Sequence, residues 1–296
     1  MTTAVAILKS VRPGQWPKNV LVFAPLVFAH QALETRSLVR ALAVFALFCL
    51  ASGAVYIVND LLDRASDREH PVKCRRPIAS GALSPAAAAA AAVLIGAGAL
   101  SAAMLLDRRV AAVLGVYLLV NLLYSRVLKH LVILDVMTIA AGFVLRVVAG
   151  GIAVGVALSS WLLLCTSLLA LFLGFGKRRH ELVLLSDGAS THRRILEEYS
   201  PYLLDQMIGV VTASTLMAYI ISTISPEMVQ KYHTDWLGLT VPFPLYGIFR
   251  YLYLVHRKEG GGSPTEMLLT DRPLLVCVAL WALAVVLIIY KQQLGL

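Results

Sequence analysis

The sequence predicts an all-α, polytopic membrane protein, and three observations lead to this fold class. Hydrophobic residues make up 59% of the 296 residues. Charged residues make up only 15%, whereas soluble globular domains contain about a quarter. Apolar runs close to the roughly 20 residues that cross a bilayer as a helix recur from one end of the chain to the other. An ordinary soluble domain is therefore excluded.

Nine apolar runs approach the length of a transmembrane helix, so we expect nine membrane-spanning helices. The first run is short and is interrupted by Pro25. The third is rich in alanine from Ala86 to Ala92 and depends on close packing against its neighbours. The runs lie near residues 19–33, 38–60, 86–106, 110–128, 131–152, 160–176, 202–224, 237–256 and 273–290.

Lysine and arginine residues are distributed unevenly between the loops, and this distribution predicts the orientation in the membrane. If the N-terminus is cytoplasmic, most of them fall in cytoplasmic segments, as the positive-inside rule requires. The same orientation places the stretch 59–81 and the segment at Lys177 on one membrane face. We therefore expect an integral protein of a bacterial-type inner (plasma) membrane, with its active site facing the cytoplasm.

The net charge of +9 does not indicate a nucleic-acid-binding protein, because no basic domain with interleaved aromatic residues is present. The charge suits anionic lipid head groups and phosphorylated substrates instead. The cysteines are far apart in the sequence and form no CxxC pair, so neither a disulfide framework nor a zinc site is expected. They are Cys49, Cys74, Cys165 and Cys277.

The densest charge cluster of the chain is NDLLDRASDREHPVKCRRPIASG at 59–81, which begins where the second apolar run ends. A helix turns by about 100° per residue. If the helix continues into this cluster, a set of polar side chains projects from one of its faces. They are Tyr56, Asn59, Asp60, Asp63 and Asp67.

Carboxylates on one helical face repel each other, so such an arrangement usually has a cation bound to it. Carboxylate and amide oxygens suit Mg²⁺, which keeps several waters and is usually completed by substrate phosphates. Lys73, Arg75 and Arg76 follow closely and offer donors for phosphate oxygens. The alternative is a solvated loop whose charges pair with one another and only set the topology.

The string NDxxDxxxD at 59–67, together with RRPIASG at 75–81, resembles the first aspartate-rich motif of the UbiA superfamily of intramembrane prenyltransferases. The resemblance covers nearly the whole chain. It implies one integral-membrane transferase domain over residues 1–296, built as a bundle of helices around a central cavity. Cytoplasmic cap loops are expected near 61–85, 177–200 and 257–272.

A second cluster, GKRRHEL at 176–182, follows the sixth apolar run, and in it both Lys177 and Arg178 are spaced to pair with Glu181 on a helix. Most of the superfamily carries here a second aspartate-rich motif, which binds a second magnesium for a prenyl diphosphate. Basic residues in its place create an anion site, so the second ligand should carry its own phosphate. The alternative is a topology anchor with a helix-capping role, favoured for Arg179, Arg193 and Arg194.

Three strings together, RPGQWPKN at 12–19, VYIVNDLLD at 55–63 and GKRxxEL at 176–182, are similar to the decaprenyl-phosphate phosphoribosyltransferase branch of the superfamily. This likeness implies Mg²⁺-dependent transfer of 5-phosphoribose from 5-phosphoribosyl 1-diphosphate to a polyprenyl (decaprenyl) phosphate. Diphosphate would be released, and the product would serve the synthesis of cell-envelope arabinan or polysaccharide precursors.

The resemblance also implies roles for individual residues. Asp60, Asp63 and Asp67 are the expected catalytic carboxylates. Asn59, Asp63 and Asp67 are the expected magnesium ligands. Glu181 would orient Lys177 or Arg178. The expected substrate contacts are Lys18, Tyr56, Lys73, Arg76, Lys129, Arg146, Lys177, Arg178 and Glu181.

Arg146 has two possible roles, because an arginine deep in a membrane helix is costly and usually faces a cavity or a partner. It could contact the ligand, or it could form a structural pair with Asp135 or with a backbone carbonyl. Tyr124 and Ser125, just before Arg126 and Lys129, could add hydroxyl donors to the site.

The main alternative function is a conventional prenyltransferase that joins a prenyl diphosphate to an aromatic or glyceryl acceptor. The missing second aspartate motif counts against it. A transporter is disfavoured because the two halves show no repeat and no matching Gly/Pro breaks. A purely structural membrane protein would not need carboxylates gathered on one face. Assembly into a homo-oligomer stays open.

Overall fold

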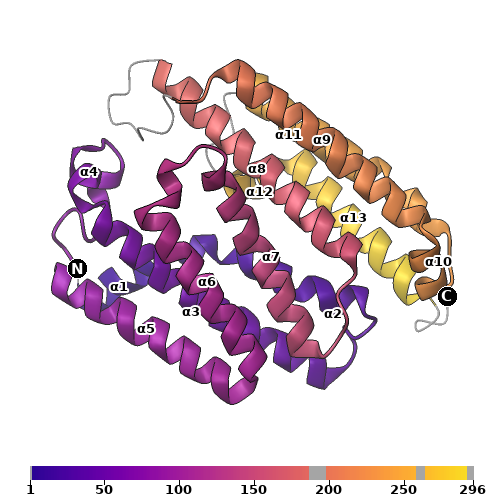
Figure 1. Ribbon diagram of the computed structural model, residues 1–296, viewed down its shortest axis with the longest axis horizontal. Helices are drawn as coiled ribbons and strands as arrows, with labels where there is room; N and C mark the ends of the chain where they lie inside the picture. Colours follow the sequence, from indigo (N-terminus) through magenta and orange to yellow (C-terminus); the bar gives the residue numbers. More distant parts are fainter. Residues whose placement is uncertain (1, 187–197, 258–263, 292–296) are drawn as a thin grey trace. The chain divides into compact units, whose positions relative to one another are not determined.

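The computed structural model describes residues 2–186, 198–257 and 264–291, and the secondary structure in these ranges is helical throughout, without strands. The chain divides into two compact units, one holding the described residues up to Ala157 and the other those from Leu158 on. Figure 1 shows the helices of both units, and each unit is described by itself below.

The first unit contains the longest helix, α3, with α5, α6 and α7 packed against it. Capping side chains start two of these helices: Ser84 accepts a hydrogen bond from the Ala87 amide, and Asp107 accepts one from the Arg109 amide. The elements are α1 (Thr3–Val11), η1 (Pro13–Phe23), α2 (Ala24–Phe28), α3 (Thr35–Leu62), α4 (Arg64–Glu69), η2 (Lys73–Arg75), α5 (Pro85–Leu106), α6 (Arg108–Arg126), η3 (Leu128–His130) and α7 (Leu134–Val154).

The second unit pairs α8 with α9 and α11 with α13. Proline occupies the first turn of α9, α10 and α13, where its missing amide proton costs nothing. The elements are α8 (Ser160–Ser186), α9 (Pro201–Ile224), α10 (Pro226–Tyr232), η5 (Trp236–Thr240), α11 (Pro242–Arg257), α12 (Pro264–Thr270) and α13 (Arg272–Tyr290).

Among the described residues, seven helices are long and apolar enough to cross a membrane, and they correspond to seven of the nine predicted runs. The run at 19–33 falls instead in the 3₁₀ helix η1 and the five-residue α2. The run at 237–256 falls in η5 and in α11, whose 16 residues extend about 24 Å, less than a hydrocarbon core of roughly 30 Å. The count of nine stays a prediction.

Helix α3 ends at Leu62, so the expectation that one continuous helix carries the whole aspartate motif is wrong. Asp63 forms the junction, and Asp67 belongs to the separate short helix α4. The hydroxyl of Ser66 donates a hydrogen bond of 2.9 Å to the carbonyl of Asp63. Such a local side-chain bond competes with regular helix bonding and favours a break at this position.

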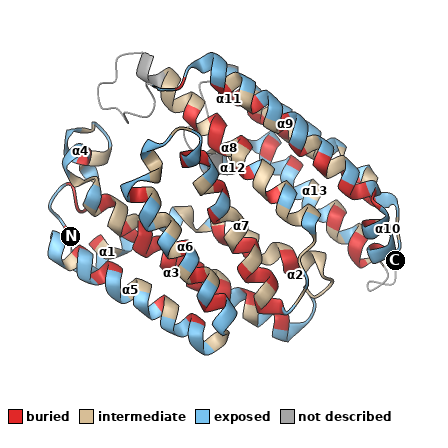
Figure 2. Ribbon diagram, in the orientation of Figure 1, coloured by how far each residue is buried: buried red, intermediate tan, exposed pale blue. Residues whose placement is uncertain are grey.

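The 3₁₀ helix η1 is unusual because it is 11 residues long, whereas 3₁₀ runs beyond about four residues are uncommon. Two glycines allow close contacts on either side of it. A Cβ atom at Gly150 of α7 would lie 2.1 Å from the carbonyl oxygen of Val22. A Cβ atom at Gly53 of α3 would lie 2.5 Å from Cγ1 of Val11. Figure 2 shows that α3 and α7 are rich in buried residues, consistent with this close packing.

We predict that Gly150→Ala lowers the melting temperature, because the new methyl group meets the Val22 backbone and overpacking of this kind costs about 1–3 kcal/mol. Gly98→Ala on α5 is the matched control, since no atom lies within 4 Å of the added Cβ. Thermal unfolding in detergent measures both variants. A melting temperature for Gly150→Ala as high as that of the control would contradict the close contact.

Candidate active site

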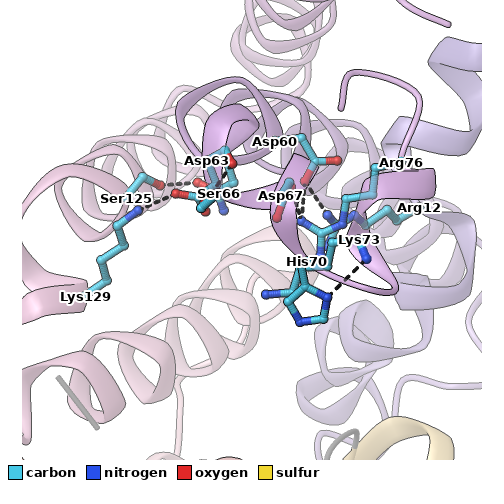
Figure 3. A network of polar contacts seen from close by, with 11 residues as sticks. Arg12, Asp60, Asp63, Ser66, Asp67, His70, Lys73, Arg76, Ser125 and Lys129 are labelled. Carbon is cyan, nitrogen blue, oxygen red and sulfur yellow. Dashed lines mark hydrogen bonds and ion pairs between the residues drawn. The ribbon is translucent and has the colours of Figure 1, made fainter. Parts of the chain in front are cut away.

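The carboxylates of the aspartate motif gather where α3 ends and α4 begins (Figure 3). Asp60 and Asp67 are almost fully buried, with 1% and 3% of their surface exposed. The side chain of Asp63 is 33% exposed. The motif therefore contains two buried carboxylates and one that solvent can reach.

Arg76 connects the two buried carboxylates. Its Nη1 atom lies 3.1 Å from Oδ1 of Asp60 and 2.7 Å from Oδ2 of Asp67. Arg12 donates a second charge-assisted hydrogen bond to Asp60 Oδ1. Buried carboxylates are stable only with such partners, so Asp60 and Asp67 draw Arg12 and the stretch after α4 to the end of α3.

Asn59 and Asp63 have partners on the other side of the cluster. Nζ of Lys129 lies 2.7 Å from Oδ1 of Asp63, and the hydroxyl of Ser125 contacts Oδ1 of Asn59. Figure 3 shows Ser125 and Lys129 on the side opposite Arg12 and Arg76. The end of α6 and η3 thereby supply the hydroxyl and the ammonium group that the sequence placed near the motif.

Arg12 also belongs to this cluster, although the sequence pattern indicated only Lys18 from the RPGQWPKN segment. Its backbone adopts a left-handed conformation with φ of 55°, just before Pro13. Its guanidinium lies over the ring of Tyr56, 5.0 Å from the ring centroid. A positive charge next to a proline in this segment was the available signal, but its partner is 48 residues away in sequence.

Tyr56, Lys18 and Lys73 stand on three different segments. Tyr56 lies on α3 one turn before Asp60 and contacts Arg12. Lys18 lies on η1, and Lys73 begins η2.

His70 lies between α4 and η2 and accepts two hydrogen bonds. The backbone amides of Val72 and Lys73 donate to its Nδ1 atom at 3.1 and 3.3 Å. Burial, with the positive charge of Lys73, lowers the pKa of His70 below its ordinary value. His70 is thus a neutral acceptor that holds the start of η2.

The donor set fits magnesium in its chemistry. Its members are carboxylate and amide oxygens, which hard cations prefer. Oδ2 of Asp60 is buried and has no hydrogen-bond partner in the described part of the chain, so it has a free lone pair for a ligand. In residues 2–186, 198–257 and 264–291, however, three or more acidic, histidine or cysteine groups do not meet at one point. Asp60 and Asp67 point to Arg76, whereas Asp63 points to Lys129.

Arg146 is buried, with 6% of its surface exposed, and its donors are directed at protein atoms. They reach Oδ1 of Asn19 at 2.7 Å, the carbonyl of Gly142 at 2.7 Å and the hydroxyl of Tyr117 at 3.0 Å. The backbone carbonyl that the sequence left open as a structural partner is therefore present. A contact of Arg146 with the ligand stays a prediction.

In the second unit, Glu181 of α8 pairs with both cations that precede it. Its carboxylate contacts Arg178, and its Oε1 lies 3.7 Å from Nζ of Lys177. Arg178 is only 1% exposed, which is unusual for an arginine. Arg179 differs because it pairs with Asp205 of α9, consistent with a structural role. Arg193 and Arg194 lie outside the described residues.

Several curated proteins resemble the chain over most of its length, and two of them, both called decaprenyl-phosphate phosphoribosyltransferase, illustrate the similarity. The protein from Corynebacterium glutamicum is 35% identical over 97% of this chain and 87% of its own length. The protein from Mycolicibacterium smegmatis is 33% identical over 93% of this chain and 89% of its own length. The similarity thus extends from the aspartate motif to the cluster at Lys177.

A solved structure of a UbiA homolog from Archaeoglobus fulgidus, bound to DMAPP and Mg²⁺, shares the fold. Its TM-score is 0.73 at 17% identity, and the match covers 96% of this chain and 98% of that one. The model of the UbiA prenyltransferase family matches residues 20–270. With seven helices long and apolar enough to cross a bilayer, the chain is an integral membrane protein, and it belongs to the UbiA prenyltransferase family.

Proposed function

We propose that this protein transfers 5-phosphoribose from 5-phosphoribosyl 1-diphosphate to a polyprenyl phosphate and releases diphosphate. The observation that carries the proposal is the basic cluster of α8, where Lys177, the buried Arg178 and Glu181 stand in place of a second set of aspartates. An anion site suits a second substrate that carries a phosphate of its own. The curated relatives bear the name of this activity.

The reaction is a displacement at the anomeric carbon of the ribose. A phosphate oxygen of the lipid forms the new bond to C1, while the bond from C1 to the diphosphate breaks and its electron pair leaves with the diphosphate. The lipid phosphate is already ionised, so no strong general base is required. The protein's task is to hold two polyanions in line with each other and to balance their charge.

The cations of both clusters are suited to this task. In the first unit, Arg76 and Lys129 already bind carboxylates at hydrogen-bond distance, and we assign them to phosphate oxygens of the substrates. Lys18, Tyr56 and Lys73 are assigned to the phosphoribosyl part, and Arg12 joins this group through its contact with Tyr56. In the second unit, Lys177 and Arg178 are assigned to a substrate phosphate and Glu181 to their orientation.

Magnesium is the proposed cofactor, with Asn59, Asp63 and Asp67 as its ligands and Asp60 as the fourth polar group of the motif. When bound, the ion would neutralise charge on the leaving diphosphate. The oxygen donors of the motif, including Oδ2 of Asp60, which has no hydrogen-bond partner among the described residues, support this assignment. The homolog from Archaeoglobus fulgidus was solved with Mg²⁺ and a prenyl diphosphate.

The proposed enzyme works at the cytoplasmic face of the membrane. The active site faces the cytoplasm, the chain works as one transferase domain with nine spans, and its product serves cell-envelope precursor synthesis. Support comes from the uneven distribution of basic residues and from the family match over residues 20–270. The expected cap loops at 177–200 and 257–272 lie partly outside the described residues.

A conventional prenyltransferase is the second candidate. The fold shared with a homolog bound to DMAPP favours it, and the aspartate motif would serve a prenyl diphosphate as well. The basic cluster at Lys177 counts against it, because an uncharged aromatic acceptor offers these cations nothing to bind. The two functions therefore differ in the substrate that the second cluster binds.

For the metal assignment, we predict that Asp63→Asn reduces magnesium-dependent turnover by about 100-fold or more, because a ligand of the ion is lost. Membrane insertion should be unaffected, since Asp63 follows the end of α3. The control is Asp107→Asn, which changes the helix cap of α6, where asparagine is also a good cap. Turnover of radiolabelled phosphoribosyl diphosphate, titrated with magnesium, measures both. Wild-type rates in Asp63→Asn would refute the role of this residue.

For the second cluster, we predict that Lys177→Ala with Arg178→Ala raises the apparent KM for one phosphorylated substrate. Each charge-assisted contact to phosphate is worth roughly 1.5–3 kcal/mol. The matched control is Arg108→Ala with Arg109→Ala, two adjacent exposed cations at the start of α6. KM values for both substrates, with melting temperatures, separate binding from folding.

A coupling assay with wild-type protein decides between the two candidate functions. Wild-type protein should not couple a prenyl diphosphate to 4-hydroxybenzoate. Robust formation of that prenylated aromatic by purified wild-type protein would make the conventional prenyltransferase correct.

For the orientation, we predict that Cys74 reacts with a membrane-impermeant maleimide only from the cytoplasmic face. Cys74 is partly exposed, Cys49 and Cys277 are buried, and Cys165 lies within the apolar helix α8. Cys74→Ser should abolish the labelling of inside-out vesicles. Labelling of Cys74 in intact cells would reverse the proposed sidedness.

A further inference from the structure

Arg146 is a positive charge inside an apolar helix of the first unit, and the mechanism above has no step for it. The acceptors that the described residues offer it are all neutral: the amide oxygen of Asn19, the carbonyl of Gly142 and the hydroxyl of Tyr117. The rings of Phe48, Tyr117 and Phe143 surround the guanidinium, with centroids 5.8, 4.9 and 5.3 Å away, respectively. Placing a cation among neutral groups inside a membrane costs free energy. A residue retained at such a cost usually has a function.

Asn19 is the contact that reaches another segment of the site. It lies on η1, is fully buried, and accepts the Nε proton of Arg146. Its own amide nitrogen lies 3.2 Å from Sγ of Cys49 and 3.5 Å from Oγ of Ser52, both on α3. Asn19 therefore connects η1 to α3 and, through Arg146, to α7.

The segment η1 needs such external support. A 3₁₀ helix has poorer hydrogen-bond geometry than an α-helix, so a run of 11 residues depends on its contacts with neighbouring helices. Gly53 accommodates Val11 before it, and Gly150 accommodates Val22 at its end. Between these contacts, the bond from Arg146 to Asn19 connects η1 to α7 through polar groups.

Arg12 stands at the beginning of this supported segment. Its backbone is left-handed, and its guanidinium contacts Asp60 and the ring of Tyr56. Lys18 immediately precedes Asn19. A displacement of η1 would therefore move Arg12 and Lys18 together.

We propose that Arg146 is a positioning residue that acts through Asn19. It holds η1 in register on α3 and α7, and in this way it keeps Arg12 at the Asp60 carboxylate and Lys18 in the site. The inference rests on the proposed function for its kinetic consequence, but the position of η1 can be measured independently of turnover.

Trp16 reports the position of η1 directly. Its indole nitrogen is buried, and the other tryptophans, at 161, 236 and 281, belong to the second unit. In a full-length protein with those three changed to phenylalanine, we expect Arg146→Ala to shift the Trp16 emission to longer wavelength and to increase acrylamide quenching. Arg40→Ala is the matched control, because Arg40 also bonds an α7 carbonyl, that of Ala153. It should leave the Trp16 emission unchanged.

Kinetics test whether the effect passes through Arg12. We expect Arg146→Ala to raise the KM for phosphoribosyl diphosphate on the order of 10- to 100-fold. Combined with Arg12→Ala, it should add little to the effect of Arg12→Ala alone, since contacts in one chain of interactions are not additive. Arg146→Lys keeps the charge but loses the planar set of donors, so it should resemble Arg146→Ala.

An unchanged Trp16 emission in Arg146→Ala would overturn the proposal, and so would losses that multiply in the double variant with Arg12→Ala. If Arg146→Ala does not fold, Asn19→Leu removes the acceptor of Arg146, together with the amide contacts to Cys49 and Ser52, and should produce the same shift of Trp16. A wild-type protein that does not use phosphoribosyl diphosphate would refute the proposed function, whereas the Trp16 measurement would still decide the role of Arg146.

Discussion

The ion cluster around Asp60 and Asp67 is the interaction on which the first unit depends. Two carboxylates that are nearly inaccessible to solvent would be very costly without cations. Arg76 bridges them and Arg12 binds Asp60 as well. Because these arginines come from the stretch after α4 and from the start of η1, neutralising the charge also brings these two segments to the end of α3. The same ion pairs therefore neutralise the buried carboxylates and hold the segments together at this end of the unit.

The same arrangement suits a site for polyanions. Each carboxylate of the motif already has a cation beside it, and Asp63 combines a partner, Lys129, with partial exposure. Cations that are held near metal-binding oxygens can bind the phosphates that a metal brings with it.

Arg146 has different surroundings from the cations of the aspartate motif. Its neutral partners stabilise a charge inside the helix bundle and connect η1 to its neighbours. Glycines at 53 and 150 permit the close approach on which this depends.

The sequence by itself determined the class of fold, the family and the principal charged residues. Apolar runs of spanning length and the NDxxDxxxD string are local patterns, and local patterns can be recognised in the sequence without the folded structure. Seven of the nine runs correspond to helices of spanning length among the described residues. The pairings of Lys177 and Arg178 with Glu181 were also predictable, since all three lie on one helix within four residues.

Only the tertiary structure decided how the motif is divided. The break at Asp63 separates Asp67 from α3. Asp60, Asp63 and Arg146 each have a partner far away in sequence, at separations of 48, 66 and 127 residues respectively. The role of Arg12 and the neutral surroundings of Arg146 follow from these distant pairings. The first and eighth runs are shortened because a 3₁₀ segment and a 16-residue helix take their place. Helical periodicity relates residues within a few turns of each other, so contacts across such separations are decided by packing and by the need to neutralise buried charge.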